Sequence, residues 1–172
     1  MSEVEAIKGC GVGDPRGFQT LYNLHKRRVY SFCFRMVNDA EEAEELTREV
    51  FLQLFREIVA SKGKLNLASQ LHRLTTDVVL ARLRKRGLDE TCVAPVEGVN
   101  RGTLEICIGE LPNRYKAIFL LHDVEGCGHK EIAELMDCSV QDSRSQLHQA
   151  RMKLRHLLHK KKDNLQELTL TF

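Results

Sequence analysis

Six cysteines and seven histidines are the residues of this chain whose types could support metal or thiol chemistry. No CxxC pair occurs, and the cysteines are irregularly spaced, at Cys10, Cys33, Cys92, Cys107, Cys127 and Cys138. Because no apolar leader precedes them, we expect a reducing compartment and no disulfide framework. One alternative is a metal site formed by residues that are close in the sequence, namely Cys127, His129, Cys138 and His122. Their spacing matches no standard zinc pattern. Free thiols are the alternative, and no motif supports a Cys/His nucleophile.

Charged side chains give a stronger chemical signal, because the two signs are segregated along the chain. The formal net charge is only +2. Residues 39–57 nevertheless hold seven acidic and two basic side chains, whereas residues 141–162 hold seven basic and one acidic. Further basic side chains gather over residues 26–35 and 72–86. Basic faces attract phosphates and an acidic face fits a basic protein surface, although each face could simply be solvated.

Helical periodicity defines the elements that must position these charges. Residues 1–17 contain four glycines and Pro15 and predict a flexible N-terminus. Apolar residues at helical spacing then predict three helices over residues 18–86, the second starting at Asp39 as an N-cap and the third near Leu67. Residues 18–86 are therefore predicted to form an N-terminal helical bundle.

The second half predicts a smaller helical domain. Residues 87–103 lose periodicity and form a predicted flexible linker, residues 104–160 a domain, and residues 161–172 a tail. Two helices, Lys130 to Met136 and one beginning at Val140, are separated by a tight turn and predict a helix-turn-helix. The predicted fold is all-α, with two small helical domains. The sequence contains no apolar run of 18 residues, so we expect no membrane-spanning segment.

The second helix of that motif has a buried stripe and a free face. Ser143 lies on the stripe and is expected to bond to a carbonyl one turn earlier. The free face carries Arg144, Ser145, His148 and Arg151, and arginine can bind guanine in a bidentate manner. Lys130 and Lys153 suit phosphates. An ordinary helical hairpin with a solvated basic face is the alternative.

Two blocks of the sequence resemble one known family. Residues 110–158 resemble the C-terminal DNA-binding domain of bacterial sigma-70 factors of the extracytoplasmic-function type, through Leu111-Pro112, Asp123-Val124-Glu125-Gly126 and Glu131-Ile132-Ala133-Glu134. Residues 17–86 are similar to the N-terminal domain of the same family, through Ala43-Glu44-Glu45-Leu46-Thr47-Arg48-Glu49-Val50-Phe51 and Leu83-Arg84-Lys85-Arg86.

The resemblance implies a factor that binds core RNA polymerase and directs it to promoter DNA, and that is not an enzyme. It implies three sets of site residues, with no catalytic or metal-binding residue and no cofactor. Polymerase would contact Asp39, Glu44, Glu45, Arg48, Glu49 and Phe51. The −10 element would contact the loop 61–66 and Arg73, Asp77, Arg82, Arg84 and Lys85, with one base unstacked. The −35 element would contact Lys130, Arg144, Ser145, His148, Arg151 and Lys153.

The resemblance also implies a cytoplasmic bacterial protein, associated with the nucleoid when bound to polymerase, and an anti-sigma factor as a further partner. The alternative is a helix-turn-helix regulator that binds DNA but not polymerase. The acidic stretch favours the first interpretation, because a simple regulator does not need it. A Cys/His hydrolase or metalloenzyme is a third hypothesis, for which the sequence offers no constellation.

Overall fold

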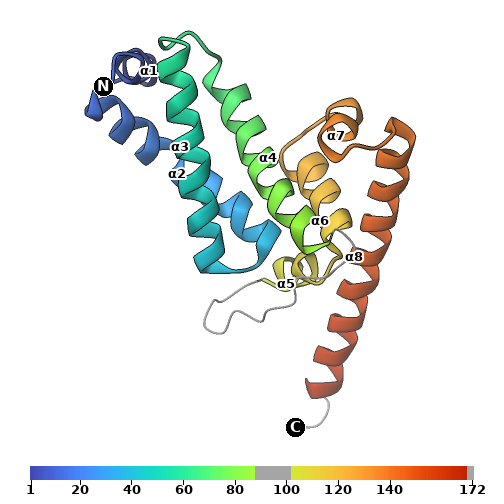
Figure 1. Cartoon of the computed structure of the whole chain (residues 1–172). Helices are drawn as coiled ribbons and strands as arrows, with labels where there is room; N and C mark the ends of the chain where they lie inside the picture. The colour runs from blue at the N-terminus through green and yellow to red at the C-terminus, as the bar shows by residue number, and fades with distance from the viewer. Residues whose placement is uncertain (88–101, 170–172) are drawn as a thin grey trace. The chain divides into compact units, whose positions relative to one another are not determined.

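The computed structural model describes residues 1–87 and 102–169, with side chains as far as residue 162. Every regular element among them is helical, which confirms the predicted all-α class (Figure 1). Contacts divide the chain into two compact units, Met1–Arg82 and Leu83–Phe172. The predicted linker at 87–103 lies mostly outside the described residues. No described helix combines the length and hydropathy needed to span a membrane.

The first unit is built on two long antiparallel helices, α2 (Pro15–Val37) and α3 (Ala40–Ala60). Asn38 adopts a left-handed conformation that ends α2, and the Asp39 carboxylate accepts a 2.8 Å hydrogen bond from the Glu42 amide. This confirms Asp39 as the N-cap of α3. The apolar residues of α3 at helical spacing are fully buried, namely Ala43, Leu46, Val50, Leu54 and Ile58. The ring of Phe55 packs edge-on at 4.6 Å from that of Phe18.

Helix α4 (Leu67–Arg86) has the predicted bounds, and the Asn66 side chain accepts a 3.1 Å hydrogen bond from the Ser69 amide at its start. The prediction of a flexible N-terminus is wrong for residues 3–11, which form helix α1 (Glu3–Gly11). Ser2 and Glu5 form a capping box, and Ala6 and Cys10 are fully buried. The glycines of this segment permit close helix packing instead of disorder.

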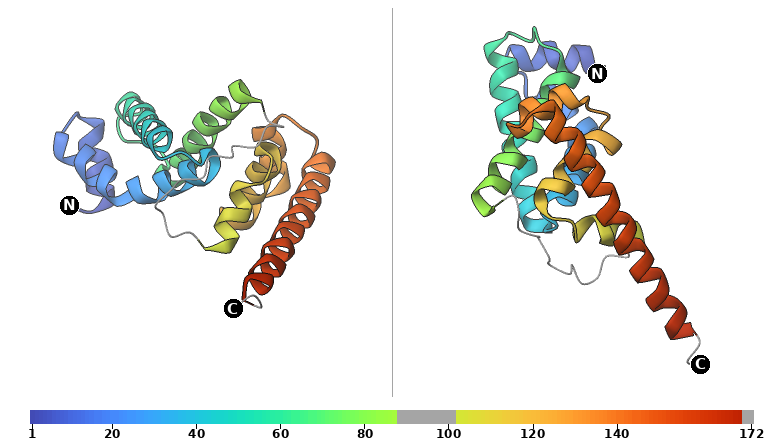
Figure 2. Two further views of the ribbon diagram at one scale, coloured as in Figure 1. Left: turned by 90° about the horizontal axis from the view of Figure 1, so that it is seen from below. Right: turned by 90° about the vertical axis from the view of Figure 1, so that its right-hand side faces the viewer.

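The second unit contains α5 (Thr103–Gly109), α6 (Asn113–Phe119), the π-helical turn η1 (Leu120–Val124), α7 (His129–Met136) and α8 (Val140–Thr169). Helix α8 packs against α5, α6 and α7, as the views in Figures 1 and 2 show. Its predicted stripe is buried at Ser143, Leu147, Ala150 and Leu154. The backbone of α8 stays helical to Thr169, so the predicted tail at 161–172 continues this helix for most of its length.

Candidate nucleic-acid interface

The turn between α7 and α8 is fixed by hydrogen bonds within its own residues. Asp137 takes a left-handed conformation, with φ at 52°, and ends α7. The Ser139 hydroxyl accepts a 2.9 Å hydrogen bond from the Asp142 amide and donates one of 2.6 Å to the Asp142 carboxylate. Ser139 is therefore the N-cap of α8, and the Asp142 carboxylate completes a capping box by accepting a 3.3 Å hydrogen bond from the Ser139 amide, at a helix end where a negative charge is favourable. The predicted helix-turn-helix is present in the second unit.

The outer face of α8 carries the residues predicted to read the −35 element. Arg144, Ser145, His148 and Arg151 are all exposed, as are the predicted phosphate contacts Lys130 and Lys153. The Lys153 ammonium lies 5.6 Å from the centre of the Tyr115 ring, so a cation–π contact holds it against α6. The helix thus presents exposed polar and basic side chains, and a major groove is wide enough to admit an α-helix.

Arg151 differs from its neighbours because it is paired within the protein. Its guanidinium donates two hydrogen bonds to the carboxylate of Asp123 in η1, from Nε at 3.0 Å and from Nη2 at 2.5 Å. These bonds hold the pKa of Asp123 below its usual value, and they raise that of Arg151. The His122 ring also contacts the Asp123 carboxylate at 2.9 Å. Sequence reasoning missed this pairing, because Asp123 lies 28 residues from Arg151 along the chain.

Ser143 finds a different partner from the one expected. The predicted back-bond to a carbonyl is wrong, because the fully buried Ser143 hydroxyl lies 3.0 Å from Nδ1 of His129. The His129 ring stacks on that of His122, with centroids 4.7 Å apart. Burial lowers the pKa of His129, and the positive charges of its neighbourhood lower it further. This arrangement joins α7 and η1 to the recognition helix.

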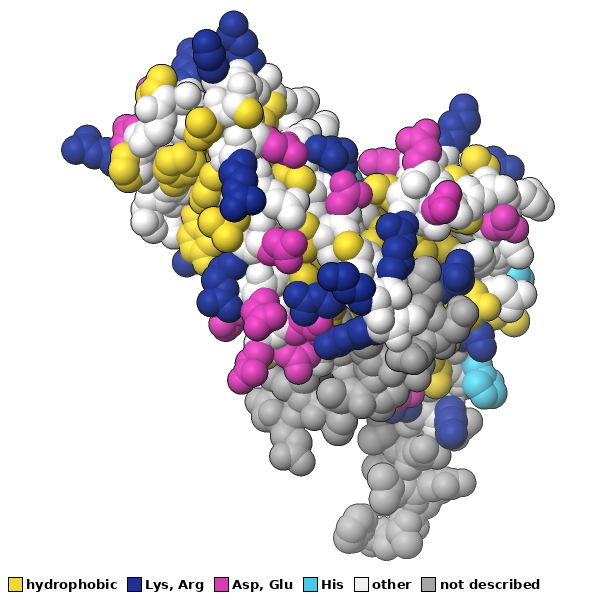
Figure 3. Space-filling model, in the orientation of Figure 1, with side chains coloured by type: hydrophobic (Ala, Val, Ile, Leu, Met, Phe, Trp, Pro, Cys, Tyr) yellow, Lys and Arg dark blue, Asp and Glu magenta, His cyan; other side chains and the backbone are white. Residues whose placement is uncertain are grey.

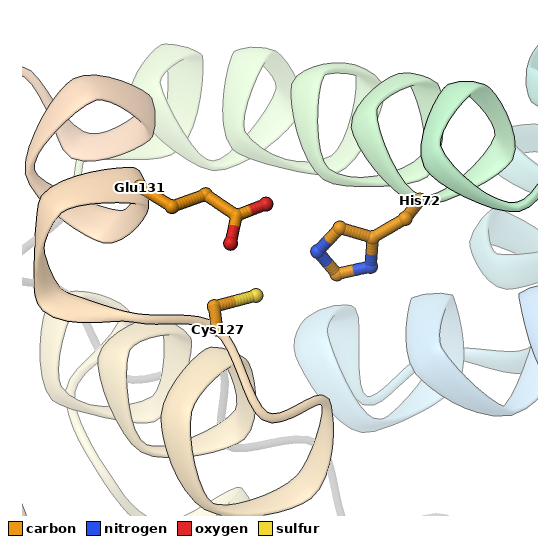
Figure 4. A group of neighbouring side chains, drawn as sticks. All are labelled: His72, Cys127 and Glu131. Atoms are coloured by element: carbon orange, nitrogen blue, oxygen red, sulfur yellow. The ribbon is translucent and has the colours of Figure 1, made fainter. Parts of the chain in front are cut away.

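In the described part of the second unit, Cys107 and Cys127 are buried and Cys138 is half-buried, whereas Cys92 lies outside the described residues. Cys127 lies in the segment before α7, and Glu131 lies in the first turn of that helix (Figure 4). Burial raises the pKa of Cys127 to about 12, and the nearby Glu131 carboxylate adds to this effect. Nδ1 of His129 contacts the Ser143 hydroxyl, and Nδ1 of His122 contacts the Asp123 carboxylate. Among the described residues, the proposed metal-ligand group of Cys127, His129, Cys138 and His122 does not gather at ligand spacing.

The acidic face of α3 carries most of the residues predicted to bind polymerase. Glu44, Glu45, Arg48 and Glu49 are exposed, and acidic side chains gather at the start of this helix (Figure 3). Phe51 is only 2% exposed, and its ring packs at 4.9 Å from that of Tyr22. The Phe51 ring therefore belongs to the core beneath this face, beside the exposed residues predicted to bind polymerase.

The residues predicted to bind the −10 element lie on α4, and two of them, Arg73 and Arg82, have acidic partners in the first unit. Arg82 Nη1 lies 2.9 Å from the buried Glu42 carboxylate and 3.8 Å from that of Glu45. Arg73 bridges Glu57 at 3.3 Å and Asp77 at 3.4 Å. The pairs with Glu42, Glu45 and Glu57 join α4 to α3, whereas the Arg73–Asp77 pair lies within α4. Arg84 and Lys85 are exposed near the end of α4, and His72 lies near its start (Figure 4).

Known proteins similar to this chain fall in one family. The model of sigma-70 region 2 matches residues 21–88, and that of sigma-70 region 4 matches residues 101–154. The ECF RNA polymerase sigma factor SigW of Bacillus subtilis is 24% identical, over 88% of this chain and 94% of the relative. SigE of Mycolicibacterium smegmatis, also named an ECF RNA polymerase sigma factor, is 29% identical over 88% of this chain and 68% of its own length.

Solved structures show the same fold. The sigma factor RpoE of Bartonella quintana, in complex with the anti-sigma factor NepR, matches with a TM-score of 0.60 and 16% identity, over 83% of this chain and 96% of that one. CnrH in complex with the cytosolic domain of CnrY matches with a TM-score of 0.59 and 15% identity, over 92% and 97%. With regions 2 and 4 both matched, in this order along the chain, the protein belongs to the sigma-70 family, in its extracytoplasmic-function group.

Proposed function

We propose that this protein binds core RNA polymerase through the acidic face of α3 and directs it to promoters whose −35 element is read by α8. The observation that carries this proposal is the presence, in one chain, of an exposed acidic helix face and an exposed basic recognition helix. The bond-forming chemistry of transcription belongs to polymerase, and this protein supplies specificity.

In the second unit, we assign base reading to Arg144, Ser145 and His148 on the first turns of α8. The N-terminal residues of a recognition helix are those that reach base edges in the major groove. Lys130 on α7 and Lys153 on α8 are placed to contact phosphates, which orient the protein without reading sequence. The buried contact between Ser143 and His129 supports this assignment, because it fixes α8 against α7.

We assign the −10 element to α4 and the turn at residues 61–66. Arg73, Arg84 and Lys85 are exposed and suit the backbone of the opening strand, on which one base is unstacked. Asp77 and Arg82 serve this interface indirectly, because the first binds Arg73 and the second binds Glu42. Glu44, Glu45 and Glu49 provide the negative charge that docks on a basic polymerase surface, and Arg48 lies exposed on the same helix.

Transcription reconstituted from core polymerase, this protein and promoter DNA tests the proposal. We expect initiation to depend on the protein and to be lost when either promoter element is scrambled. A helix-turn-helix regulator would instead bind duplex DNA tightly by itself and never associate with core polymerase. That outcome would replace the proposed function with the alternative one.

Substitution of Arg144 tests the assignment of the −35 element. Arg144→Ala should weaken discrimination at one −35 base pair by about 1–3 kcal/mol, the usual contribution of a bidentate arginine. Lys160→Ala is the matched control, because it removes the same charge from an exposed position roughly 24 Å along the same helix. Equal losses in both variants would indicate a general charge effect and contradict base reading by Arg144.

Charge reversal on α3 tests the polymerase surface. Glu49→Lys should weaken binding to core polymerase roughly tenfold or more, because like charges repel across an interface. Glu49→Gln separates charge from shape, and Glu134→Lys places the same reversal at an exposed position of α7. The binding is measured without DNA, and an unchanged dissociation constant for Glu49→Lys would move the polymerase surface away from this face.

An anti-sigma factor and a location at the nucleoid complete the proposed function. The two solved complexes support the first, since each pairs a protein of this fold with a second chain. We place the protein in the cytoplasm with polymerase, and on the nucleoid when the complex is assembled. Recovery of a stoichiometric partner with the tagged protein from uninduced cells, and its loss on induction, is the expected result.

A further inference from the structure

Helix α1 approaches the turn between α3 and α4 so closely that only glycine fits at the contact. A Cβ atom on Gly11 would lie 2.6 Å from the amide nitrogen of Gly63 and 2.7 Å from the carbonyl carbon of Lys62. A Cβ atom on Gly63 would lie 3.0 Å from the carbonyl oxygen of Ile7. Both obstacles are backbone atoms, which cannot rotate away as the end of a side chain can. Figure 1 shows α1 beside this turn in the first unit.

The same helix is held at its other side by an equally close contact. A Cβ atom on Gly17, in the first turn of α2, would lie 2.6 Å from the Ala6 carbonyl oxygen and 2.8 Å from the Cys10 amide nitrogen. Ala6 and Cys10 are fully buried at this contact. Helix α1 is thus wedged between the start of α2 and the turn, and a shift of α1 must move one of them.

The turn itself has an unusual backbone that needs support. Lys62 and Gly63 both adopt positive φ angles, 53° and 73°, and lysine rarely takes this conformation. Three backbone hydrogen bonds close the turn, from Lys62 to Val59 at 3.0 Å, from Gly63 to Ile58 at 2.8 Å and from Lys64 to Ser61 at 3.1 Å. The side chains of Lys62 and Lys64 are exposed. The backbone conformation of the turn sets the direction in which these two cations point.

We propose that α1 is a positioning element for promoter opening, which holds the turn at residues 61–66 in the shape that presents Lys62 and Lys64 to the phosphates of the separated −10 strand. The inference rests on the proposed function, because that function assigns this turn to the −10 element. Backbone contact through Gly11 and Gly63 transmits the position of α1 to the turn. The strand itself is bound by the lysines, by counterion release.

A pair of glycine substitutions tests the proposal within α1. Gly11→Ala inserts a methyl group into the backbone of the turn, whereas Gly9→Ala inserts one whose nearest neighbour is 3.6 Å away, an ordinary contact. Both changes replace glycine by alanine within α1, so both favour the helix. We expect Gly11→Ala to slow opening of the −10 region by about tenfold, since a displacement near 1 Å can cost as much as about a hundredfold in a positioned reaction. Gly9→Ala should open at the original rate.

The measurement uses holoenzyme on a promoter with 2-aminopurine at the −10 element, and binding of core polymerase and of −35 duplex are followed in parallel. Gly11→Ala should leave both of these unchanged. Lys62→Ala combined with Lys64→Ala should also slow opening, and adding Gly11→Ala to that variant should have no further effect, because the lysines are then absent. Normal opening by Gly11→Ala, or effects that add, would overturn the proposal.

Two further results separate failure of this proposal from failure of the proposed function. If the lysine variant opens normally while transcription depends on the protein, the turn has no −10 role and both assignments to it are wrong. If only the lysine variant is impaired, the −10 role stands and the positioning role of α1 is wrong. If Gly11→Ala also loses polymerase binding, the double variant Ser2→Ala with Glu5→Gln tests the role of α1 instead. It disrupts the exposed capping box without adding an atom. The proposal requires this variant to slow opening.

Discussion

The positive charge of Arg151 is paired with the Asp123 carboxylate inside the protein. Its two hydrogen bonds to Asp123 satisfy one edge of the guanidinium, and the carboxylate neutralises it. A helical pattern shows which residues face outward, but it cannot show that a residue from η1 lies opposite. The outward position of Arg151 was therefore predictable from the sequence, whereas its ion pair depends on tertiary packing.

Asp123→Asn should increase the salt sensitivity of DNA binding. Freed from its partner, Arg151 can neutralise one more phosphate, so the slope of log K against log salt should steepen by about 0.9. Fluorescence anisotropy of the protein on a duplex at several salt concentrations measures this slope. Asp137→Asn is the control, because Asn also accepts the left-handed backbone at that exposed site. An unchanged slope in Asp123→Asn would mean that Arg151 already contacts DNA.

Cysteine reactivity should follow burial. Cys10, Cys33, Cys107 and Cys127 are buried, and burial raises the pKa of each thiol above its ordinary value. Cys138 is half-buried. We expect iodoacetamide at pH 8 to alkylate Cys138 before these four in the native protein, and all five at similar rates in denaturant. Peptide mass spectrometry resolves the sites, and early labelling of Cys33 would contradict the described core.

At the scale of elements, α3 and α4 were the most predictable. The stripe of α3 and the bounds of α4 follow from apolar spacing, and Asp39 marks the start of α3 by its type. Helix α1 was missed because its glycines suggest flexibility when the chain is considered alone. Gly11 and Gly17 lie instead where backbones touch, which only the packed structure reveals.

The N-cap of α3 offers a test of how far this element depends on its first residue. Asp39→Ala should reduce the free energy of unfolding of the first unit by about 1 kcal/mol, because the Glu42 amide loses its acceptor. Asp39→Asn keeps an acceptor oxygen and should cost far less. Urea denaturation followed by circular dichroism compares the two variants. Equal stability of Asp39→Ala and the parent would show that the cap contributes nothing.

On the scale of the whole molecule, a net charge of +2 conceals surfaces of opposite sign. The acidic face of α3 belongs to the first unit and the basic face of α8 to the second. Counting charges by segment predicted this division, and the loss of helical periodicity over residues 87–103 predicted two domains. The count could not show which charges pair internally, as Arg82 does with Glu42 and Arg151 does with Asp123.

Buried thiols in both units should make the protein sensitive to alkali. Burial raises the pKa of Cys10 to about 11 and those of Cys33 and Cys127 to about 12, from 9.0 in the absence of burial. Above pH 9 the unfolded chain therefore loses protons that the folded chain keeps, and stability falls as the pH rises toward 11 or 12. Denaturant midpoints measured from pH 8 to 11 test this slope, which Cys33→Ala should flatten. If the slope of Cys33→Ala equalled that of the parent protein, Cys33 would be near solvent in the folded state.

The contact at Gly17 has a consequence for how this chain can evolve. Every missense change that one nucleotide can produce in a glycine codon introduces a Cβ atom, and at this position that atom would meet the backbone of α1 at 2.6 Å. No single mutational step from Gly17 is therefore neutral unless α1 moves at the same time. Gly17 is therefore expected either to stay glycine or to change together with residues of α1.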